Sequence, residues 1–391
     1  MKKTGKNVSP AKIKVIGIGG AGGNAISRMV KNFPKGIDFV AINTDIQDLN
    51  HTKAKKKIFI GRNITKGLGT GMKPELGKKA AEDAKEEISQ ALKGADIIFI
   101  TAGFGGGTGT GASPVVAEIA RELGILTIAV ITKPFSFEGA ERSRLAEEGI
   151  ANLGEKVDAV ITIPNDRIFN LIDKETSLPK AFEEIDEVLK NAIEGISEII
   201  MTSGVINVDF ADVKTILENT GLAVIGVGKA AGKDRAINSV NLACNSPLLE
   251  IPIDGAKAAL FSIASNRDLK MEEVNEIAQV ISSNLDSNAK IIFGTYHSSN
   301  LKKGELKTIV IATGFIDQLT KPLRAQTDLF IRSVEKEKEQ PTLIEEKMKE
   351  KLQPLDLGKP KDKKSVEKKA KTSPPDEDIW EVPAFLRKKR K

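Results

Sequence analysis

Two glycine-rich segments carry residues suited to binding phosphate. The first, GIGGAGGN over residues 17–24, fits the G-x-G-x-x-G spacing found where a strand turns into a helix. Backbone without side chains lets a pyrophosphate approach the helix N-terminus at such a turn. The alternative is structural, because glycines here would also permit a tight turn and close packing.

The second segment, GGGTGTG over residues 105–111, holds five glycines and two threonines in seven residues. Successive N–H groups in such a loop can form an anion-binding nest, and the dipole of the following helix adds a favourable potential. The hydroxyls of Thr108 and Thr110 can also donate to phosphate oxygens. The alternative is a flexible linker, which the directly adjoining strand and helix patterns argue against.

The residue types argue against a Walker-type nucleotide site, a disulfide and a zinc site. The G-x-x-x-x-G-K-[ST] pattern of Walker-type NTPases is absent from the sequence. Cys244 is the only cysteine, which excludes an internal disulfide, and the two histidines, His51 and His297, leave too few soft ligands for zinc. We therefore expect no metal site built from side chains, and a protein of the reducing cytosol.

The elements that position these loops follow a repeating pattern. Short runs rich in Val and Ile alternate with longer helical patterns, as in βαβ units around a parallel sheet. The composition agrees with an α/β fold, since 40% of residues are hydrophobic but only 4% are aromatic. Ligands of such sheets bind beyond the carboxyl ends of the strands. The predicted strands span residues 14–17, 38–43, 96–102, 126–132 and 159–164.

A long helix is predicted over residues 177–202, and a second, smaller α/β domain follows it. Apolar side chains recur along the helix at helical spacing. They are Phe182, Ile185, Leu189, Ile193, Ile196 and Ile200. The second domain is predicted from strands at 223–227, 290–296 and 307–315 and helices at 235–244 and 271–283.

The C-terminal region differs in composition from the rest of the chain. Residues 334–391 carry 17 Lys and Arg against 13 Asp and Glu, which is +4 of the total formal charge of +6. The remainder is nearly neutral, which argues against a nucleic-acid-binding surface. From about residue 321 the polar composition predicts a disordered linker. No run reaches the roughly 20 apolar residues that span a bilayer, so we expect a soluble protein without a transmembrane segment.

Together these motifs resemble FtsZ, the tubulin-like GTPase family of cell division. The resemblance rests on the loop at 105–111 and on four further motifs that occur in the family's order, and it extends over residues 13–315 and the C-terminal end. These motifs are NTD at 43–45, GLGTG at 67–71, PFSFEG at 134–139 and NVDFAD at 207–212.

The resemblance implies a Rossmann-like parallel-sheet GTPase domain joined by a central helix to a smaller α/β domain. The implied division of the chain is a flexible N-terminus (1–12), the GTP-binding domain (13–177), the connecting helix (178–202), a C-terminal α/β domain with a catalytic acidic loop (203–320), a disordered linker (321–375) and a partner-binding tail peptide (376–391).

The same resemblance assigns residues to the parts of GTP. Glu138 and Arg142 would hold the ribose and phosphate side, and their i, i+4 spacing places them on one helix face. An ordinary surface ion pair is the alternative for these two residues. Phosphate contacts would come from Gly20, Ala21, Gly22, Gly23, Asn24, Gly106, Gly107, Thr108, Gly109 and Thr110.

Guanine would be recognised by Phe182, Asp186 and Asn165. In the family these positions stack on the base and hydrogen-bond to it. A carboxylate can accept from both N1–H and the exocyclic amine of guanine, whereas adenine offers no such pair of donors, so Asp186 would set specificity. Without the resemblance, the helical spacing of Phe182 favours a core residue over a contact to a base.

Catalysis is assigned to the acidic loop through Asn207, Asp209 and Asp212. About 20 helical residues separate this loop from the guanine-binding positions, or about 30 Å at 1.5 Å per residue. The loop therefore cannot reach its own nucleotide. The resemblance implies that it completes the site of the next subunit, head to tail, which generates filaments. The alternative is that Asp209 is an N-cap and Asp212 an ordinary first-turn acid.

The resemblance also implies cofactors, partners and a location. GTP would be the substrate, GDP the product and Mg²⁺ the phosphate counterion. The tail at 376–391 would bind membrane-tethering division proteins on the inner face of the membrane at the division site, and the basic residues 388–391 could add weak affinity for acidic lipid. A merely solvated charged end is the alternative.

Two rival functions come from other classes. A nicotinamide-dependent oxidoreductase would use the loop at 17–24, but it needs an acidic residue at the end of the second strand, where Asn43 stands. It also leaves the second glycine loop unexplained. A nonenzymatic scaffold would follow if filaments formed and Asp209 and Asp212 supported no hydrolysis.

Overall fold

The computed structural model describes residues 11–315, apart from residues 31, 32, 34, 35, 174, 203 and 299. The linker expected at 321–375 and the tail expected at 376–391 lie outside the described residues, as do the first ten residues of the expected flexible N-terminus. Among the helices that the structure describes, none is both long and apolar enough to cross a membrane.

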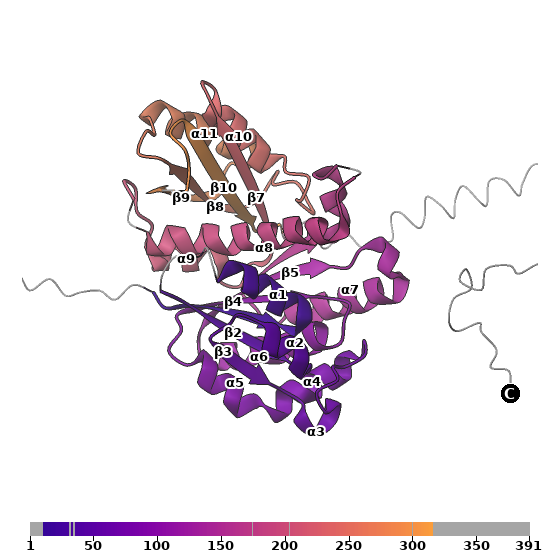
Figure 1. Cartoon of the computed structure of the whole chain (residues 1–391). Coiled ribbons are helices and arrows are strands. Elements are labelled where there is room, and N and C mark those ends of the chain that lie inside the picture. Colours follow the sequence, from indigo (N-terminus) through magenta and orange to yellow (C-terminus); the bar gives the residue numbers. More distant parts are fainter. Residues whose placement is uncertain are drawn as a thin grey trace, which may run out of the picture. The chain divides into compact units, whose positions relative to one another are not determined.

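The N-terminal part alternates strands and helices as the sequence predicts (Figure 1). Its strands are β1 (Ile13–Ile18), β2 (Ile37–Asn43), β3 (Lys56–Phe59), β4 (Ile97–Gly103), β5 (Leu126–Lys133) and β6 (Ala159–Pro164). Its helices are α1 (Gly19–Met29), α2 (Ile46–His51), α3 (Arg62–Thr65), α4 (Pro74–Asp83), α5 (Lys85–Leu92), α6 (Thr108–Glu122) and α7 (Ala140–Gly154), with 3₁₀ turns η1 (Ser136–Glu138) and η2 (Asn165–Asn170).

The C-terminal part begins with the long helix α8 (Leu178–Met201). It continues through α9 (Phe210–Leu217), β7 (Gly221–Ala231), α10 (Arg235–Cys244), β8 (Ala258–Ser265), α11 (Met271–Asn284), β9 (Lys290–His297) and β10 (Glu305–Thr313). The long helix predicted over residues 177–202 and both predicted helices of the second part are therefore present. The predicted α/β class is confirmed.

The ten described strands form one sheet in the order β3-β2-β1-β4-β5-β6-β7-β10-β8-β9. The first six are parallel to one another, and β7 joins β6 in parallel over only three residue pairs, Ala159↔Gly221 to Ile161↔Ala223. Beyond this short join, β10 pairs antiparallel with β7 and β8. The sequence predicted two α/β domains and did not show that a short parallel pairing joins their strands into one sheet.

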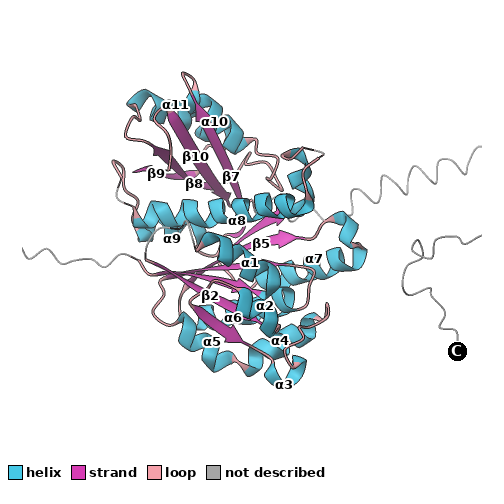
Figure 2. Cartoon of the chain, viewed as in Figure 1, coloured by secondary structure: helices cyan, strands magenta, loops and turns pink. Residues whose placement is uncertain are grey.

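Both faces of the parallel sheet are covered, as Figure 2 shows. Within β1, Val15 packs into the core cluster shared with α1, α8 and α9, whereas Ile16 packs into the cluster on the opposite face with α4, α5, α6 and α7. Burial on both faces explains why the strands read as near-continuous apolar runs. Helices α10 and α11 cover the outer face of the C-terminal strands.

Helix α8 lies between the two parts of the sheet (Figure 1). Its residues Leu189, Ile193 and Ile196 belong to the same core cluster as β1 and β4 on one side and β10 on the other. Because both parts pack on this helix, it fixes the distance between the loops at its two ends.

Candidate functional site

A cavity of about 520 Å³ opens at the carboxyl ends of β1, β4, β5 and β6, beside the first turns of α8. This volume lies within the range of small-molecule sites. Its walls contain most of the residues that the sequence singled out. From that set, Gly20, Ala21, Asn24, Gly106, Gly107, Thr108, Gly109, Glu138, Arg142, Asn165, Phe182 and Asp186 line the cavity.

Two helix N-termini point their free N–H groups at this cavity. Helices α1 and α6 begin in the two glycine loops, and neither has a side-chain N-cap or an acidic residue in its first turn. Elsewhere in the chain, α2 and α9 are capped by Asp45 and Asp209, whereas α3, α8 and α10 also lack a side-chain cap and a first-turn acid. What sets the starts of α1 and α6 apart is their place beside the cavity. The first N–H groups of a helix need acceptors, and the dipole favours negative charge there. The two uncapped ends therefore suit the phosphate groups of a ligand.

Close packing explains some of the glycines in these loops. A Cβ on Gly22 would lie 2.4 Å from the carbonyl oxygen of Thr101, and a Cβ on Gly107 would lie 2.0 Å from Thr70 Oγ1. Gly106 is different, because a Cβ there would meet no atom within 4 Å and its φ is not positive. Gly106 lines the cavity, so its lack of a side chain leaves room for a ligand to approach the backbone.

Three threonine hydroxyls gather beside the glycine loops. Thr108 Oγ1 lies 2.6 Å from Thr44 Oγ1 and 3.3 Å from Thr70 Oγ1. Thr110, in contrast, accepts a hydrogen bond from the N–H of Gly105 at 3.0 Å, and it lies outside the cavity lining together with Gly22 and Gly23. Gly22, Gly23 and Thr110 therefore support the shape of the loops without facing the cavity.

The wall formed by η1 and α7 carries an ion pair. Arg142 Nη1 donates to Glu138 Oε2 at 2.5 Å, and Glu138 Oε1 accepts from the N–H of Phe135 at 2.9 Å. Both carboxylate oxygens thus have partners from the same short segment. The pair presents an acceptor and a donor side by side, which suits ribose hydroxyls and a phosphate oxygen.

The opposite end of the cavity offers an aromatic ring and two polar side chains. Phe182 is 40% exposed although it lies on the opening turns of α8, and its ring stands edge-on to buried Phe135 with centroids 5.6 Å apart. Asn165 is buried, and its Oδ1 has no hydrogen-bond partner. An unpartnered buried oxygen costs free energy unless a ligand supplies a donor. This end therefore suits a planar base with N–H groups.

Asp186 faces the same end of the cavity from α8. Burial raises the pKa of its carboxyl to about 6, and the guanidinium of Arg28, which hydrogen-bonds to its Oδ2, opposes that rise. Thr70, which belongs to the GLGTG motif at 67–71, also lines the cavity, and so does Arg28, which the sequence did not single out. A signal for Arg28 existed, since it follows Asn24 by four residues on α1 and so shares its face.

The acidic loop lies at the other end of α8. Asp209 caps α9 by accepting from the N–H of Asp212 at 2.8 Å, and Asn207 Oδ1 accepts from the N–H of Gly204 at 2.7 Å. The side chains of Asn207, Asp209 and Asp212 are exposed. The structure thus does not bring these three residues to the cavity, since α8 separates them from it by about 30 Å at 1.5 Å per residue.

The loop is docked on the C-terminal strands. Ile206 and Thr295 of β9 form a β-bridge, with the N–H of Thr295 donating to Ile206 O at 3.0 Å. A Cβ on Gly204 would lie 1.4 Å from the carbonyl oxygen of Thr295, so the backbones touch. The loop is therefore held in place although its acidic side chains face outward.

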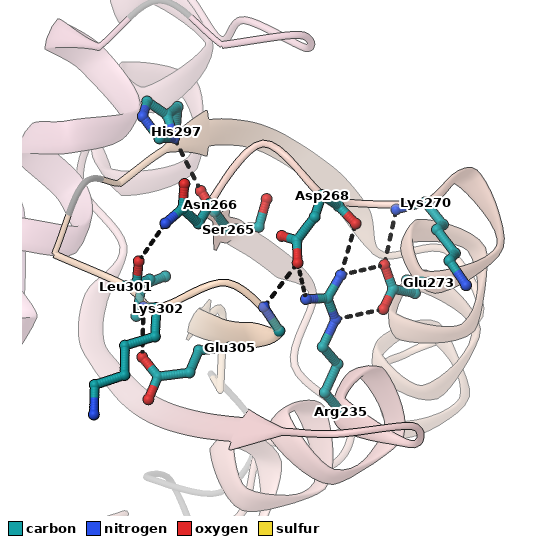
Figure 3. Close-up of polar contacts among 11 residues, drawn as sticks. Arg235, Ser265, Asn266, Asp268, Lys270, Glu273, His297, Leu301, Lys302 and Glu305 are labelled. Atoms are coloured by element: carbon teal, nitrogen blue, oxygen red, sulfur yellow. Dashed lines mark hydrogen bonds and ion pairs between the residues drawn. The ribbon is translucent and has the colours of Figure 1, made fainter.

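A buried arginine braces the turns beside this loop (Figure 3). Arg235 is 4% exposed, and it donates to Glu273 Oε1 at 2.6 Å and to Asp268 Oδ2 at 2.8 Å. Asp268 Oδ2 also accepts from the N–H of Gly304 at 2.8 Å. Because a guanidinium offers five donors in a fixed plane, Arg235 ties α10, α11 and the β9–β10 connection together.

Two further observations limit the chemistry of the described residues. Asn43 is buried, with its amide donating to Asp48 at 2.8 Å, so the acid that an oxidoreductase needs at the end of β2 is replaced by a structural amide. Among the described residues, no group of three or more His, Cys, Asp or Glu side chains could hold a metal ion.

Comparisons with known proteins agree with this geometry. Residues 12–173 match the Tubulin/FtsZ family GTPase domain, and residues 221–316 match the FtsZ family C-terminal domain. The solved empty dimer of FtsZ from M. jannaschii is 46% identical, with a TM-score of 0.75, covering 78% of this chain and 89% of that chain.

More distant structures share the fold. CetZ1 from Haloferax volcanii, a GDP-bound monomer, is 23% identical with a TM-score of 0.67, covering 78% of this chain and 94% of that chain. CetZ2 from the same organism, a GTPγS-bound protofilament, is 24% identical with a TM-score of 0.66, covering 81% and 98%. The 46% identity to FtsZ over most of both chains, with a cavity that offers acceptors for a base and donors for phosphates, shows that the chain belongs to the FtsZ family of tubulin-like GTPases.

Proposed function

We propose that this GTPase polymerises head to tail into filaments and hydrolyses GTP at the interface between subunits. The observation that carries the proposal is the separation of the cavity from the acidic loop along α8, a helix of 24 residues. At about 1.5 Å per residue, no side chain of the loop can reach the cavity of its own chain. The loop of one subunit and the cavity of another must then meet for hydrolysis.

Different residues of the cavity bind different parts of GTP. Gly20, Ala21, Gly106, Gly107 and Gly109 present backbone to the phosphates, and Glu138 and Arg142 hold the ribose and phosphate side. Support comes from the two uncapped helix ends and from the open space at Gly106. The further contacts that we propose come from Asn24 and Thr108, whereas Gly22, Gly23 and Thr110 lie outside the cavity lining and support the shape of the loops.

Guanine is read by Phe182, Asn165 and Asp186. The exposed ring of Phe182 stacks on the base, and the unpartnered Oδ1 of Asn165 accepts one of its N–H groups. Asp186 accepts from N1–H and the exocyclic amine, a pair of donors that adenine lacks. A site that pairs its buried polar groups with guanine rejects a base that leaves them unpaired.

Mg²⁺ accompanies the phosphates in this proposal. The hydroxyl oxygens of Thr70 and Thr108, which lie 3.3 Å apart in residues that line the cavity, are ligands of the kind that a hard cation accepts. When bound, the ion neutralises negative charge on the phosphates.

The acidic loop supplies the catalytic groups in trans. Asp209 and Asp212 orient and deprotonate the attacking water, and Asn207 holds the loop shape through its bond to Gly204. Capping and catalysis are compatible, because the Asp209 cap fixes the start of α9 and with it the position of Asp212. A contact in which the two surfaces differ does not close on itself, so it propagates as a filament.

The cellular role follows from the family. The relative from M. jannaschii was solved as a dimer, which supports self-association. We propose that the filaments form the division ring at the septum, on the cytoplasmic face of the membrane. The tail at 376–391 would bind membrane-tethering division proteins, and nucleic acid is not a partner.

The test is the dependence of GTP turnover on protein concentration. Turnover per subunit should be near zero in dilute solution and should rise above a threshold, and Asp212→Asn should remain low at every concentration. Constant turnover per subunit from a species that sediments as a monomer would refute hydrolysis in trans.

A further inference from the structure

Arg28 links the helix of the first glycine loop to the base end of the cavity. It projects from the last turn of α1, and its Nη1 donates both to Asp186 Oδ2 and, at 3.1 Å, to the backbone carbonyl of Phe182. Both partners belong to α8 and are the residues proposed to read guanine. No other ion pair of Asp186 is found among the described residues.

The position of Arg28 on α1 explains how it reaches this point. Residues 20, 24 and 28 are spaced by four, so they lie along one face of the helix. Gly20 and Asn24 line the phosphate and middle portions of the cavity, and Arg28 lines its base end. Helix α1 therefore lines the cavity from its phosphate end to its base end.

The contact leaves acceptor capacity on Asp186. An ionised carboxylate has two oxygens and about four lone-pair sites, and Arg28 uses one of them on Oδ2. Oδ1 and the second site on Oδ2 remain for two N–H donors from a base. The guanidinium of Arg28 thus fixes the orientation of the Asp186 carboxylate without using all of its hydrogen-bond acceptor sites.

Arg28 opposes the effect of the other surroundings on Asp186. Its side chain is only 13% exposed, and burial disfavours the ionised form. Glu183 on the same helix acts in the same direction, and Arg28 from α1 acts against both. The other charged groups that line the cavity, Glu138 and Arg142, are paired with each other.

We propose that Arg28 is a positioning residue for guanine specificity, which holds the Asp186 carboxylate ionised and oriented so that it accepts both N–H groups of the base. This inference rests on the proposed role of Asp186. A different arrangement is conceivable on the same contact, in which Arg28 occupies Asp186 as a plug that GTP must displace. The two arrangements predict opposite effects of removing the guanidinium.

The experiment measures dissociation constants of GTP and ITP for the full-length protein, below its assembly threshold, between pH 5.5 and 8. ITP carries N1–H but lacks the exocyclic amine, so the ratio of the two constants reports how well Asp186 reads the base. The variants are Arg28→Gln, which removes the charge, Arg28→Lys, which keeps it, and Lys180→Gln. Lys180 is an exposed cation on α8 outside the cavity lining and serves as the matched control.

At pH 7.5, Arg28→Gln should weaken GTP binding about tenfold, as expected for a lost hydrogen bond to a charged group, and should bring the GTP and ITP constants closer together. Because the variant lacks the cation that opposes the raised pKa of Asp186, its GTP affinity should begin to fall at a higher pH than that of the wild type. Arg28→Lys should recover most of the affinity and the pH profile, and Lys180→Gln should match the wild type.

The possible failures can be distinguished. If the wild type itself binds GTP and ITP equally, and Asp186→Ala changes neither constant, the proposed base recognition fails. If the wild type discriminates but Arg28→Gln has the same ratio and pH profile, the role of Arg28 alone is refuted. Tighter GTP binding by Arg28→Gln would also overturn it, in favour of the plug.

Discussion

The cavity and the acidic loop lie at opposite ends of α8 and differ in how their polar groups are satisfied. In the cavity, helix ends are uncapped, Asn165 Oδ1 has no partner, and Asp186 is partly buried with a raised pKa. At the acidic loop, Asp209 caps its helix and Asn207 is hydrogen-bonded to Gly204, while the carboxylates face outward.

In the proposed account, this difference separates nucleotide binding from hydrolysis. A region with unsatisfied buried groups gains free energy when a ligand supplies the missing partners. A region whose backbone is satisfied but whose charges are exposed gains nothing from a small ligand and is available to another surface. In the proposed account, one chain holds the nucleotide cavity at the start of α8 and, beyond the end of this helix, the acidic groups that act on the nucleotide of a neighbouring subunit.

The largest expected effect comes from overfilling the phosphate loop. Gly107→Ala places a Cβ 2.0 Å from Thr70 Oγ1 and 2.8 Å from the N–H nitrogen of Lys73, so the loop must shift. We expect GTP affinity to fall by a factor of about 100 or more, together with a loss of stability of about 1–3 kcal/mol from overpacking. Binding isotherms and thermal unfolding of the nucleotide-free protein measure the two effects.

Gly106→Ala is the matched control for that variant. Its Cβ meets no atom within 4 Å, so the nucleotide-free protein should unfold at the wild-type temperature while GTP binding still weakens. Wild-type GTP affinity in Gly106→Ala would show that no phosphate approaches this residue.

A second large effect is expected at the acidic loop. Asp212→Asn removes the charge from an exposed side chain that is not the cap, so folding and GTP affinity should stay unchanged. Turnover in assembled filaments should fall by a factor of about 100 to 1,000, typical of losing a group that acts in the transition state. If turnover falls only because assembly fails, sedimentation in the presence of GTP will reveal it, and the catalytic role is then wrong.

A moderate effect concerns the cost of keeping Asp186 buried. Its pKa is raised from an ordinary value of 3.8 to about 6. Because the folded pKa lies above the unfolded one, the contribution to stability is fully present below pH 4 and is lost as the pH rises through 6. At pH 7.5, Asp186→Asn should therefore make the nucleotide-free protein more stable, by at most about 3 kcal/mol at 1.4 kcal/mol per pKa unit.

Urea unfolding at pH 4 and pH 7.5 checks this expectation. The difference between Asp186→Asn and the wild type should shrink at the lower pH, while the variant binds GTP poorly at both. A variant that is less stable than the wild type at pH 7.5 would mean that the pair with Arg28 outweighs the cost of burial.

The smallest expected effect separates capping from catalysis at Asp209. Asn is as good an N-cap as Asp, so Asp209→Asn should keep the stability of the protein, whereas Asp209→Ala should lose about 1 kcal/mol. Both should lose turnover if the carboxylate is catalytic. Normal turnover in Asp209→Asn would reduce this residue to a cap.

Periodic elements were predictable from the sequence, and short or tertiary ones were not. The helix α10 (Arg235–Cys244) and the strand β6 (Ala159–Pro164) match the predicted ranges because apolar spacing alone defines them. In contrast, β3 has only four residues, two of them lysines, and β8 is rich in alanine, so neither carries a strand pattern. The join of β6 to β7 depends on three residue pairs and leaves no mark in the sequence.

The candidate site follows the same division. The glycine loops that follow strands predicted the phosphate-binding end of the cavity. The spacing of four residues predicted that Phe182 and Asp186 lie on one face of the long helix. The contact of Thr70 with Gly107 could not be predicted, because it depends on two loops 37 residues apart folding onto each other. The buried position of Thr110 outside the cavity likewise depends on a hydrogen bond from Gly105 that forms only in the folded loop.

Mixing two inactive variants tests hydrolysis in trans most directly. Asp212→Asn keeps the cavity and loses the acidic loop, whereas Asp186→Asn keeps the loop and loses guanine binding. Each alone should turn over GTP at roughly 1% of the wild-type rate or less. In a randomly mixed filament, about a quarter of the interfaces join an intact cavity to an intact loop. The account predicts recovery of up to about that fraction of wild-type turnover, and a mixture no more active than the sum of its parts would contradict it.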